Sequence, residues 1–509
     1  MAGTGSGAFV RKPLETVREE ANNTGMRRSL GPIQLVLIGI GCIIGAGVYV
    51  MTGTAAATYA GPAVVISFAL AGLACAFTGL CYAELASVLP ASGASYTYAY
   101  AAMGEVVAWA LGWMFMLECW LAGSALAVGF AGYFVSLLAD FGVHVPAAIS
   151  TSFVSGEMTP AGVHFGLSGG VNLVAASALA IATVVLVRGV AHSAAANTVL
   201  VVIKIGVLAG FVLIGSQHID TANWTPFIPA NEGGFRYGVP GIFRAASILF
   251  FAYFGFEAVA TAAAEARQPQ RDIPIGILGA LGVSTIVYGV VALVLTGVVS
   301  YRTLNVPDPI AVAVNAIGMP VIAVIVKVGA LTGLASVLLV NTYGQSRVLY
   351  AISADGLLPA AYSRIHPRFG TPANGTILVA ILSAIAAALL PITLLADLVS
   401  IGTACVFTTV AISVMWLRSA RPDLPRPFRV PLGGVWIRGR WIGVVPVLAI
   451  LLCLTMMGPV LTDIVAKAIA GEWLPGTILL VYILLGATIY WRYGRKHSRL
   501  RLAAARGRT

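Results

Sequence analysis

The feature that most limits the fold of this chain is a series of long apolar runs almost free of charge. The chain has 509 residues, of which 59% are hydrophobic and 10% are charged, whereas a soluble protein carries about 25% charged residues. Only helices and closed barrels satisfy their backbone hydrogen bonds in lipid, and barrel strands alternate apolar and polar residues. The uniformly apolar runs therefore predict an all-α polytopic membrane protein.

The runs predict twelve transmembrane helices, since a helix of about 20 apolar residues crosses the hydrocarbon core. Pro62, Pro274, Pro320 and Pro372 lie at or near predicted span starts, where the missing proline N–H costs least. The predicted spans are 33–55, 61–87, 105–138, 171–188, 194–216, 239–262, 274–299, 320–350, 373–391, 395–417, 441–463 and 474–493.

The basic residues predict a multi-pass protein of the plasma or inner membrane with both termini in the cytoplasm, because Lys and Arg accumulate on the cytoplasmic side. Most of the 30 Lys and Arg residues lie in the N-terminal tail, the 418–440 loop and the C-terminal tail. The net charge of +11 is thus an orientation signal, and no nucleic acid partner is expected. In this orientation the basic residues outside are Arg236, Arg244, Arg302 and Lys467.

A cluster of glycines interrupts the first predicted span, in the stretch GCIIGAGVYV at 41–50. Gly39, Gly41, Gly45 and Gly47 fall within nine residues, although glycine costs about 1 kcal/mol relative to alanine in a helix interior. A dinucleotide-binding loop does not fit, because Ile44 replaces the third glycine and no strand precedes it. Helix packing through a GxxxG pair is one alternative. A helix unwound at mid-membrane to hold a substrate carboxylate is the other, which the density of glycines favours.

A second interruption is predicted in the sixth span, FFAYFGFEAVATAAAE, where Gly255 and Glu257 fall in the middle of the apolar run. An intramembrane carboxylate is costly and usually functional. Breaks in the first and sixth spans are what an inverted repeat of five plus five helices would produce.

Several ordered motifs resemble those of the amino acid–polyamine–organocation superfamily, and most closely its cationic amino acid transporter branch and the bacterial relatives of that branch. The resemblance covers roughly residues 30–490. Its motifs are GCIIGAGVYV, AGPAVVISF at 60–68, CYAELASVLPASGASYTYAY at 81–100, FFAYFGFEAVATAAAEARQPQRDIPIGI at 250–277 and QSRVLYAISADGLLP at 345–359.

The resemblance implies the leucine-transporter-like fold, with broken helices 1 and 6 and two peripheral helices. The expected divisions are a basic N-terminal tail at 1–30, the first five-helix repeat at 31–217, the second repeat at 218–417, a linker at 418–440, helices 11 and 12 at 441–493 and a basic tail at 494–509. It also implies that the amides around Ile43, Ile44, Gly45, Ala46 and Gly47 hold the α-carboxylate of an amino acid, and that the carbonyls near Phe251, Ala252 and Phe254 hold its α-ammonium. Ala46 replaces a threonine common in bacterial relatives, and Phe254 is bulkier than expected.

Ionisable residues within the predicted spans are candidates for ion coupling. Burial of Lys204 favours its neutral form, and in proton-coupled relatives a fifth-span lysine resembles a built-in replacement for the cation of sodium-coupled members. Lys204 is therefore expected to carry a proton, the alternative being a structural lysine held by helix-1 carbonyls. Glu118 is expected to be its partner, a second proton site or a packing carboxylate. Glu257 and Tyr253 are assigned to gating.

Other polar residues near the span ends lead to weaker expectations. Lys327 can extend toward the outer surface and is interpreted as structural. Tyr96, Tyr98 and Tyr100 are interpreted as an interfacial aromatic belt. A charge network at an inner gate is expected from Glu84, Glu265, Arg271 and Arg347.

The leading hypothesis is a proton-coupled transporter of cationic or small neutral L-amino acids, and an ion-independent amino acid exchanger is the alternative. A channel or an amino acid sensor is less consistent with isolated charges and short tails. The chain is not expected to be an enzyme, because it has no HExxH, nucleophile elbow or P-loop. No cofactor or metal is expected. The expected partners are the amino acid, protons, the lipid bilayer and, less strongly, a small single-span membrane subunit.

Overall fold

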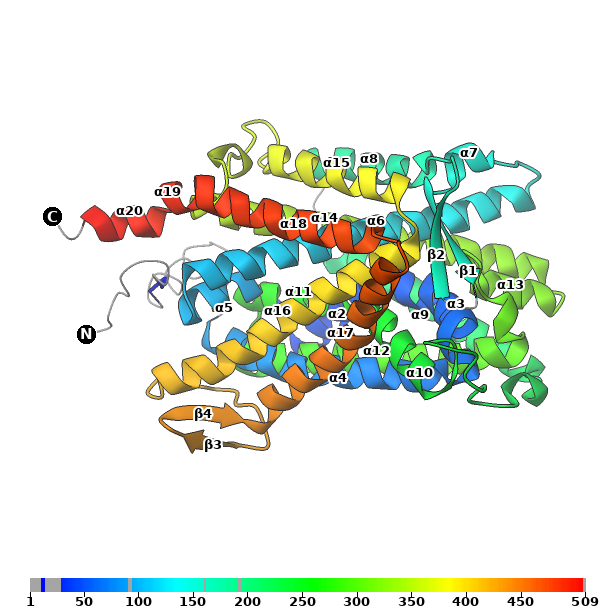
Figure 1. Ribbon diagram of the computed structural model, residues 1–509, viewed down its shortest axis with the longest axis horizontal. Coiled ribbons are helices and arrows are strands. Elements are labelled where there is room, and N and C mark those ends of the chain that lie inside the picture. The colour runs from blue at the N-terminus through cyan, green and yellow to red at the C-terminus, as the bar shows by residue number, and fades with distance from the viewer. Residues whose placement is uncertain (1–10, 14–28, 90–93, 160–161, 190–193, 507–509) are drawn as a thin grey trace.

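The computed structural model describes residues 11–13, 29–89, 94–159, 162–189 and 194–506 of the chain. It is a bundle of helices that mostly run along the long axis of the molecule (Figure 1). At one end of the bundle lie α5 (Ala94–Ala102), α20 (Arg499–Arg506) and the hairpin of β3 (Gly434–Ile437) and β4 (Arg440–Gly443). At the other end lie α13 (Pro309–Ala316) and the hairpin of β1 (Val154–Thr159) and β2 (Gly162–Leu167). These are called the α20 end and the α13 end.

The long helices overlap the predicted spans, whereas α5, α13 and α20 lie outside them. In the first part of the chain the other helices are α2 (Pro32–Ile43), η1 (Gly47–Met51), α3 (Thr52–Ala55), η2 (Ala56–Ala60), η3 (Gly61–Ala63), α4 (Val64–Val88), α6 (Glu105–Asp140), α7 (Ala147–Ser150), α8 (Leu173–Val187), α9 (Ala194–Gly215), η4 (Ser216–His218) and η5 (Thr221–Trp224).

The second part continues with α10 (Gly238–Leu249), η6 (Phe250–Tyr253), α11 (Glu257–Thr261), η7 (Ala262–Glu265), α12 (Pro269–Val298), η8 (Tyr301–Thr303), α14 (Pro320–Ala354), η9 (Ala360–Tyr362), α15 (Ala373–Leu389), α16 (Ile392–Ala420), α17 (Val444–Ile469), α18 (Leu474–Ile489), η10 (Tyr490–Gly494) and α19 (Arg495–His497).

Within the part of the chain that the structure describes, nine helices are long and apolar enough to cross a membrane. Three shorter apolar helices, α2, α8 and α15, accompany them. This composition confirms a polytopic helical membrane protein.

The centre of the bundle is formed by α6, which packs against α14 and α16, and by α12, which packs against α4 and α2. The helices at its edge are far less covered by protein: 28% of the apolar window of α9, 33% of that of α17 and 22% of that of α18 is buried. Since lipid covers apolar side chains as well as protein does, these faces fit a position against the bilayer.

The prediction of an all-α chain is wrong in detail, because two antiparallel hairpins connect helices. Val154 pairs with Leu167 in the first hairpin, and Gly434 pairs with Gly443 in the second. The second hairpin turns at Arg438 and Gly439, which both have positive φ (50° and 75°). A two-residue type I′ turn requires positive φ at both of its central residues. The first hairpin lies in a predicted loop, and the second takes up the end of a predicted loop and the first residues of the predicted span 441–463, which begins as a helix only at Val444.

Candidate functional site

The first predicted interruption is present. α2 ends at Ile43, Ile44 is extended (φ −72°, ψ 99°), and helical structure resumes after Gly45 with a π-helical turn from Gly47. The Thr52 hydroxyl donates to the carbonyls of Gly47 and Val48 at 3.2 and 3.0 Å. Because the first N–H groups of a helix have no partner inside it, the residues at this break present backbone donors suited to an anion.

The second interruption is also present. η6 ends at Tyr253, Phe254 is extended (ψ 137°), and α11 begins at Glu257. Gly255 has φ +112°, a conformation that favours glycine. A Cβ there would lie 2.9 Å from the backbone oxygen of Cys42. The carboxylate of Glu257 accepts a hydrogen bond from the Gly255 N–H at 3.2 Å, so Glu257 stabilises the break rather than facing water.

The two breaks touch each other. A Cβ on Gly47 would lie 2.3 Å from the Cβ and 2.7 Å from the Cα of Ala252, so the backbones meet without an intervening side chain. Tyr288 of α12 connects the breaks, because its hydroxyl lies 2.7 Å from the carbonyl oxygen of Ile43 and 3.0 Å from that of Ala252. Sequence reasoning missed Tyr288, since it falls in an apolar span without a motif.

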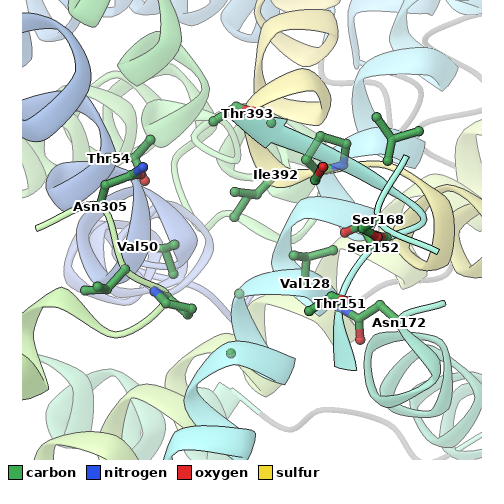
Figure 2. A pocket seen from close by; sticks show the side chains of 18 of the residues that line it. Val50, Thr54, Val128, Thr151, Ser152, Ser168, Asn172, Asn305, Ile392 and Thr393 are labelled. Carbon is green, nitrogen blue, oxygen red and sulfur yellow. The ribbon is translucent and has the colours of Figure 1, made fainter. Parts of the chain in front are cut away.

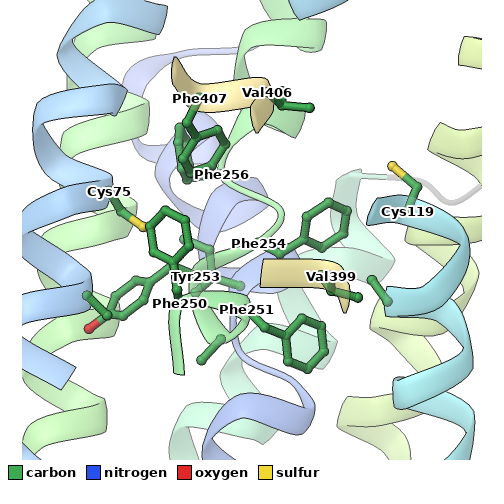
Figure 3. Close-up of a cluster of buried hydrophobic side chains, with 14 of the residues drawn as sticks. Cys75, Cys119, Phe250, Phe251, Tyr253, Phe254, Phe256, Val399, Val406 and Phe407 are labelled. Atoms are coloured by element: carbon green, nitrogen blue, oxygen red, sulfur yellow. The ribbon is translucent and has the colours of Figure 1, made fainter. Parts of the chain in front are cut away.

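Aromatic rings surround the second break (Figure 3). Phe256 and Phe250 pack against Phe407 of α16, with ring centroids 5.2 and 5.5 Å apart. Phe251 and Phe254 extend toward Val399 of α16 in Figure 3 and are 4% and 9% exposed. The side chains drawn around the second break are therefore mainly apolar, while polar side chains such as Tyr288 and Glu257 contact the backbone of the breaks.

Lys204 of α9 lies beside the first break and is fully buried. Its ammonium donates to the carbonyl of Gly41 at 2.9 Å, and its backbone carbonyl accepts from the Tyr49 hydroxyl at 3.4 Å. Gly333 of α14 makes room for it, since a Cβ there would lie 3.2 Å from Lys204 Cγ. Lys204 thus sits between α2, α9 and α14, and none of the described carboxylates is paired with it.

Glu118 of α6 is fully buried and does not contact Lys204. The hydroxyl of Thr403 donates to its Oε1 at 2.7 Å, while its Oε2 has no partner. Glu118 and Glu257 are close enough to interact electrostatically. Tyr253, the other gating candidate, donates from its hydroxyl to the carbonyl of Phe68 at 2.9 Å.

A buried ion network that the sequence analysis did not predict surrounds Arg244. Arg244, predicted to lie outside, is 0% exposed within α10. Its guanidinium donates twice to Asp397 of α16, at 2.8 and 2.7 Å, and once to Asp463 of α17, at 3.2 Å. It also lies 4.9 Å from the centroid of the Tyr59 ring. The missed signal was Asp397, an isolated carboxylate inside an apolar run.

The structural interpretation of Lys327 agrees with its contacts: it donates to Asp140 at 2.6 Å and lies 3.8 Å from Asp308. Burial raises the pKa of the Asp308 carboxyl, while Ser136 and Lys327 oppose that rise. This cluster ties α6 and α14 to the loop before α13.

Two expectations at the α20 end are wrong. Glu84 contacts Arg418 of α16 and Arg426 of the segment that follows α16, at 2.5 and 3.7 Å, rather than Arg271 or Arg347. The rings of Tyr96, Tyr98 and Tyr100 are 1% exposed and so are not an interfacial belt. A helix, α5, carries these tyrosines back into the bundle, where an apolar span was not predicted.

A cavity of about 430 Å³ opens at the α13 end (Figure 2). Val50 of η1 and Thr54 of α3, which follow the first break, form one wall, and Val128 of α6 lies opposite. Ser152 and Asn172, from the segments on either side of the first hairpin, complete it. The floor lies close to the break, since a Cβ on Gly129 would lie 3.1 Å from Val50 and 3.7 Å from Ala46.

The six cysteines form no disulfide, and five of them are buried. Among the described residues no group of His, Cys, Asp or Glu could hold a metal ion.

Two broken helices in contact, beside an uncharged cavity in an apolar helical bundle, define the architecture of a membrane transporter. The chain belongs to the amino acid permease family, since the family model described as "Amino acid permease" matches residues 30–489. The family and the relatives below are permeases and transporters, which confirms the predicted superfamily and a transport role in place of an enzymatic one.

Curated relatives match over most of their length. The methylthioribose transporter of Bacillus subtilis (strain 168) is 40% identical over 496 residues, which cover 97% of this chain and 99% of the relative. The branched-chain amino acid permease BcaP of the same organism is 38% identical, with 97% and 98% covered. The vacuolar cationic amino acid transporter 4 of Arabidopsis thaliana is 36% identical, with 81% and 67% covered.

Proposed function

We propose that this protein is a secondary active transporter of L-amino acids that works by alternating access. The observation that carries the proposal is the contact between the two broken helices, where Gly47 meets Ala252 and Tyr288 bridges Ile43 and Ala252. The family of the chain and its permease relatives support the same substrate class.

The amino acid backbone would bind between the breaks. The N–H groups at Gly45, Ala46 and Gly47 lie where a helical segment begins and suit the α-carboxylate, because the N-terminus of a helix carries partial positive charge. Ile44 would border this site, since its own N–H donates to the carbonyl of Ile40. The carbonyls near Phe251, Ala252 and Phe254 end a helical segment and suit the α-ammonium. Ile43, the last residue of α2, would lie beside the bound backbone of the amino acid. Every contact to the backbone of the substrate then comes from main-chain atoms.

The side chain of the substrate would meet the apolar part of the site. Phe251, Phe254 and Ile43 favour small neutral side chains, and Ala46 offers no hydroxyl. Relatives include a methylthioribose transporter, a branched-chain amino acid permease and cationic amino acid transporters, so the family scaffold accommodates very different solutes. Broad specificity for small neutral or cationic amino acids is proposed on this basis.

The membrane topology is proposed as twelve spans in two inverted five-helix repeats, at 31–217 and 218–417, with α17 and α18 as the peripheral pair. Breaks in the first and sixth spans support the repeat. Both termini are proposed to be cytoplasmic, which places the α20 end inside, since the basic tail and the 418–440 linker lie there. A small single-span subunit stays a prediction.

Proton coupling is proposed to run through Lys204. Its bond to the Gly41 carbonyl supports this role, because protonation of Lys204 would hold α2 against α9 and α14 and deprotonation would release it. Glu118, with one unpartnered oxygen, and Glu257 are proposed as further proton sites or gating groups, and Tyr253 as a gating residue. Exchange of two amino acids without ion coupling is the second candidate.

The test uses purified protein in liposomes, with labelled alanine and arginine, in sodium-free buffer. Accumulation that depends on an inward proton gradient is expected, and the faster substrate identifies the preferred side chain. Uptake that ignores the gradient and requires amino acid trapped inside would identify an exchanger.

The site itself is tested with Gly47→Ala, whose Cβ would clash with the backbone of Ala252, so uptake of both substrates should be lost. Gly206→Ala is the matched control, because nothing lies within 4 Å of a Cβ at Gly206. Normal uptake by Gly47→Ala would contradict the proposed site.

A further inference from the structure

The hairpin of β3 and β4 exposes an unusual amount of apolar surface for a segment between two helices. Leu432, Val435, Trp436 and Ile437 are 66%, 59%, 56% and 50% exposed. Side chains alternate between the faces of a strand, so Val435 and Trp436 point in opposite directions and both faces of β3 are apolar. An apolar surface of this kind promotes aggregation when it is exposed to water. We therefore expect lipid or protein to cover it.

The hairpin is held firmly in place. Trp441 of β4 is 6% exposed, and the guanidinium of Arg418 lies 3.9 Å from the centroid of its ring. The backbone N–H of Trp441 donates to the Ser419 hydroxyl at 2.8 Å. Gly434 and Gly443 lie against the Trp441 ring, where a Cβ would come within 2.7 Å and 2.2 Å of ring atoms. One Trp thus anchors the hairpin to α16 while Trp436 is presented outward.

The position of the hairpin favours lipid as the covering partner. β4 continues directly into α17, and Val444, Leu451 and Leu454 of α17 are 43%, 54% and 45% exposed. In Figure 1 the hairpin lies at the outer edge of the bundle, at the α20 end. The apolar surface of β3 therefore continues the surface that α17 turns away from the bundle.

The charge around the hairpin fits an anionic surface. The sequence has no Asp or Glu between Asp423 and Asp463. Arg429, Arg438 and Arg440 are exposed, and no described carboxylate pairs with any of them. Tryptophan beside basic residues is typical of the membrane–water interface, and the guanidinium group is well suited to bind phosphate.

We propose that the β3–β4 hairpin docks into the headgroup region of the bilayer leaflet at the α20 end, with Val435, Trp436 and Ile437 in the interface and with Arg438 and Arg440 bound to the phosphates of anionic phospholipids. This goes beyond transport, because it assigns a lipid-binding surface outside the substrate site. The assignment of that leaflet to the cytoplasmic side rests on the proposed topology.

The test places an environment-sensitive fluorophore on Ile437→Cys in the full-length protein, in vesicles of phosphatidylcholine with phosphatidylglycerol. Nitroxide-bearing lipids are expected to quench this label, and aqueous iodide is expected to quench it poorly. Pro425→Cys, exposed in the same linker, is the control and should respond to iodide. The unsubstituted protein reports labelling of the native thiols, five of which are buried.

The charge contribution is tested by comparing nitroxide attached to phosphatidylglycerol with nitroxide attached to phosphatidylcholine. Stronger quenching by the anionic lipid is expected, and Arg438→Gln with Arg440→Gln should abolish the difference. Strong iodide quenching at Ile437→Cys would place the hairpin in water, and protection from both quenchers would show a protein partner or a second copy; either result overturns the proposal. Equal quenching by both lipids would overturn its anionic part. The fluorescence measurement does not depend on amino acid uptake. Failure of the lipid-docking proposal can therefore be distinguished from failure of the proposed transport function.

Discussion

Lys204 and Arg244 are both fully buried cations within the helical bundle, yet the protein holds them in opposite ways. Lys204 donates to one neutral carbonyl, that of Gly41. Arg244 is bound twice by Asp397 and once by Asp463. Loss of a proton from Lys204 would leave no unpaired carboxylate behind. Arginine, in contrast, stays protonated in proteins, and the charge of Arg244 compensates the buried carboxylates of Asp397 and Asp463. The difference makes Arg244 a permanent connection, and it is the contrast on which the proposed coupling role of Lys204 rests.

The largest expected effect is that of Arg244→Ala. Removing one partner of a buried ion pair leaves the other charge uncompensated and costs about 3–5 kcal/mol. The purified variant should show a much lower melting temperature and a smaller monodisperse fraction than the parent protein.

The double variant Arg244→Met with Asp397→Leu is the control for that prediction. It removes both charges of the bidentate pair and should recover part of the lost stability. If Arg244→Ala were as stable as the parent protein, Arg244 would not be a structural connection and its contrast with Lys204 would fail.

Lys204→Ala is expected to affect coupling more than stability. It leaves the Gly41 carbonyl without its donor, which costs about 1–3 kcal/mol, less than the cost expected for Arg244→Ala. Uptake in liposomes should no longer respond to a proton gradient, while exchange of labelled for unlabelled amino acid should persist. Retained gradient-driven accumulation would show that Lys204 is a structural cation, like Arg244.

Tyr288→Phe tests the connection between the two breaks, which is made by an uncharged hydroxyl group. The substitution removes a hydroxyl that lies within hydrogen-bond distance of two buried carbonyls, at a cost of about 1–3 kcal/mol. A raised KM for amino acid uptake is expected, because the breaks would no longer be held at a fixed separation.

Tyr482→Phe is the matched control for Tyr288→Phe. It also removes one buried tyrosine hydroxyl, but that hydroxyl donates to the carbonyl of Trp113 in α6 at 2.7 Å and to neither break. Equal changes in KM for the two variants would show that the effect is not specific to the bridge.

The smallest effect is expected for Arg302→Gln, which breaks an exposed ion pair with Glu232 at 2.9 Å. Exposed pairs contribute about 0–1 kcal/mol. The hydrogen bond from Arg302 lowers the pKa of Glu232, so the small contribution is present at neutral pH and is lost as the pH falls through that lowered pKa. A melting temperature close to that of the parent protein at pH 7 would confirm that charge pairing matters here mainly where it is buried.

Hydropathy and composition predicted the helices well, because lipid leaves few alternatives for an apolar run. The break at Gly45 and the break at Gly255 were also predictable, since glycines and a carboxylate are out of place inside a membrane helix. The burial of Arg244 was not predicted because this residue lies near the start of its span, where an apolar pattern cannot distinguish a loop cation from a buried one. Its partner Asp397 carries the sequence signal that identifies it.

Contacts made by single groups could not be predicted in the same way. Tyr288 differs from any other tyrosine of an apolar span only through the two carbonyls that its hydroxyl meets in three dimensions. The hairpin of β3 and β4 was missed because its strands are short and follow a proline-rich segment. Its stability comes from the packing of Trp441 under Arg418, which is a tertiary contact.

The cavity at the α13 end has a consequence for the rate at which solutes enter. None of the residues that line it carries a formal charge, so its walls exert little long-range attraction or repulsion on an approaching ion. Charged entrances accelerate the arrival of oppositely charged solutes in a manner that salt suppresses. The walls of this cavity add no such steering of their own, which leaves discrimination between solutes to the groups deeper in the protein.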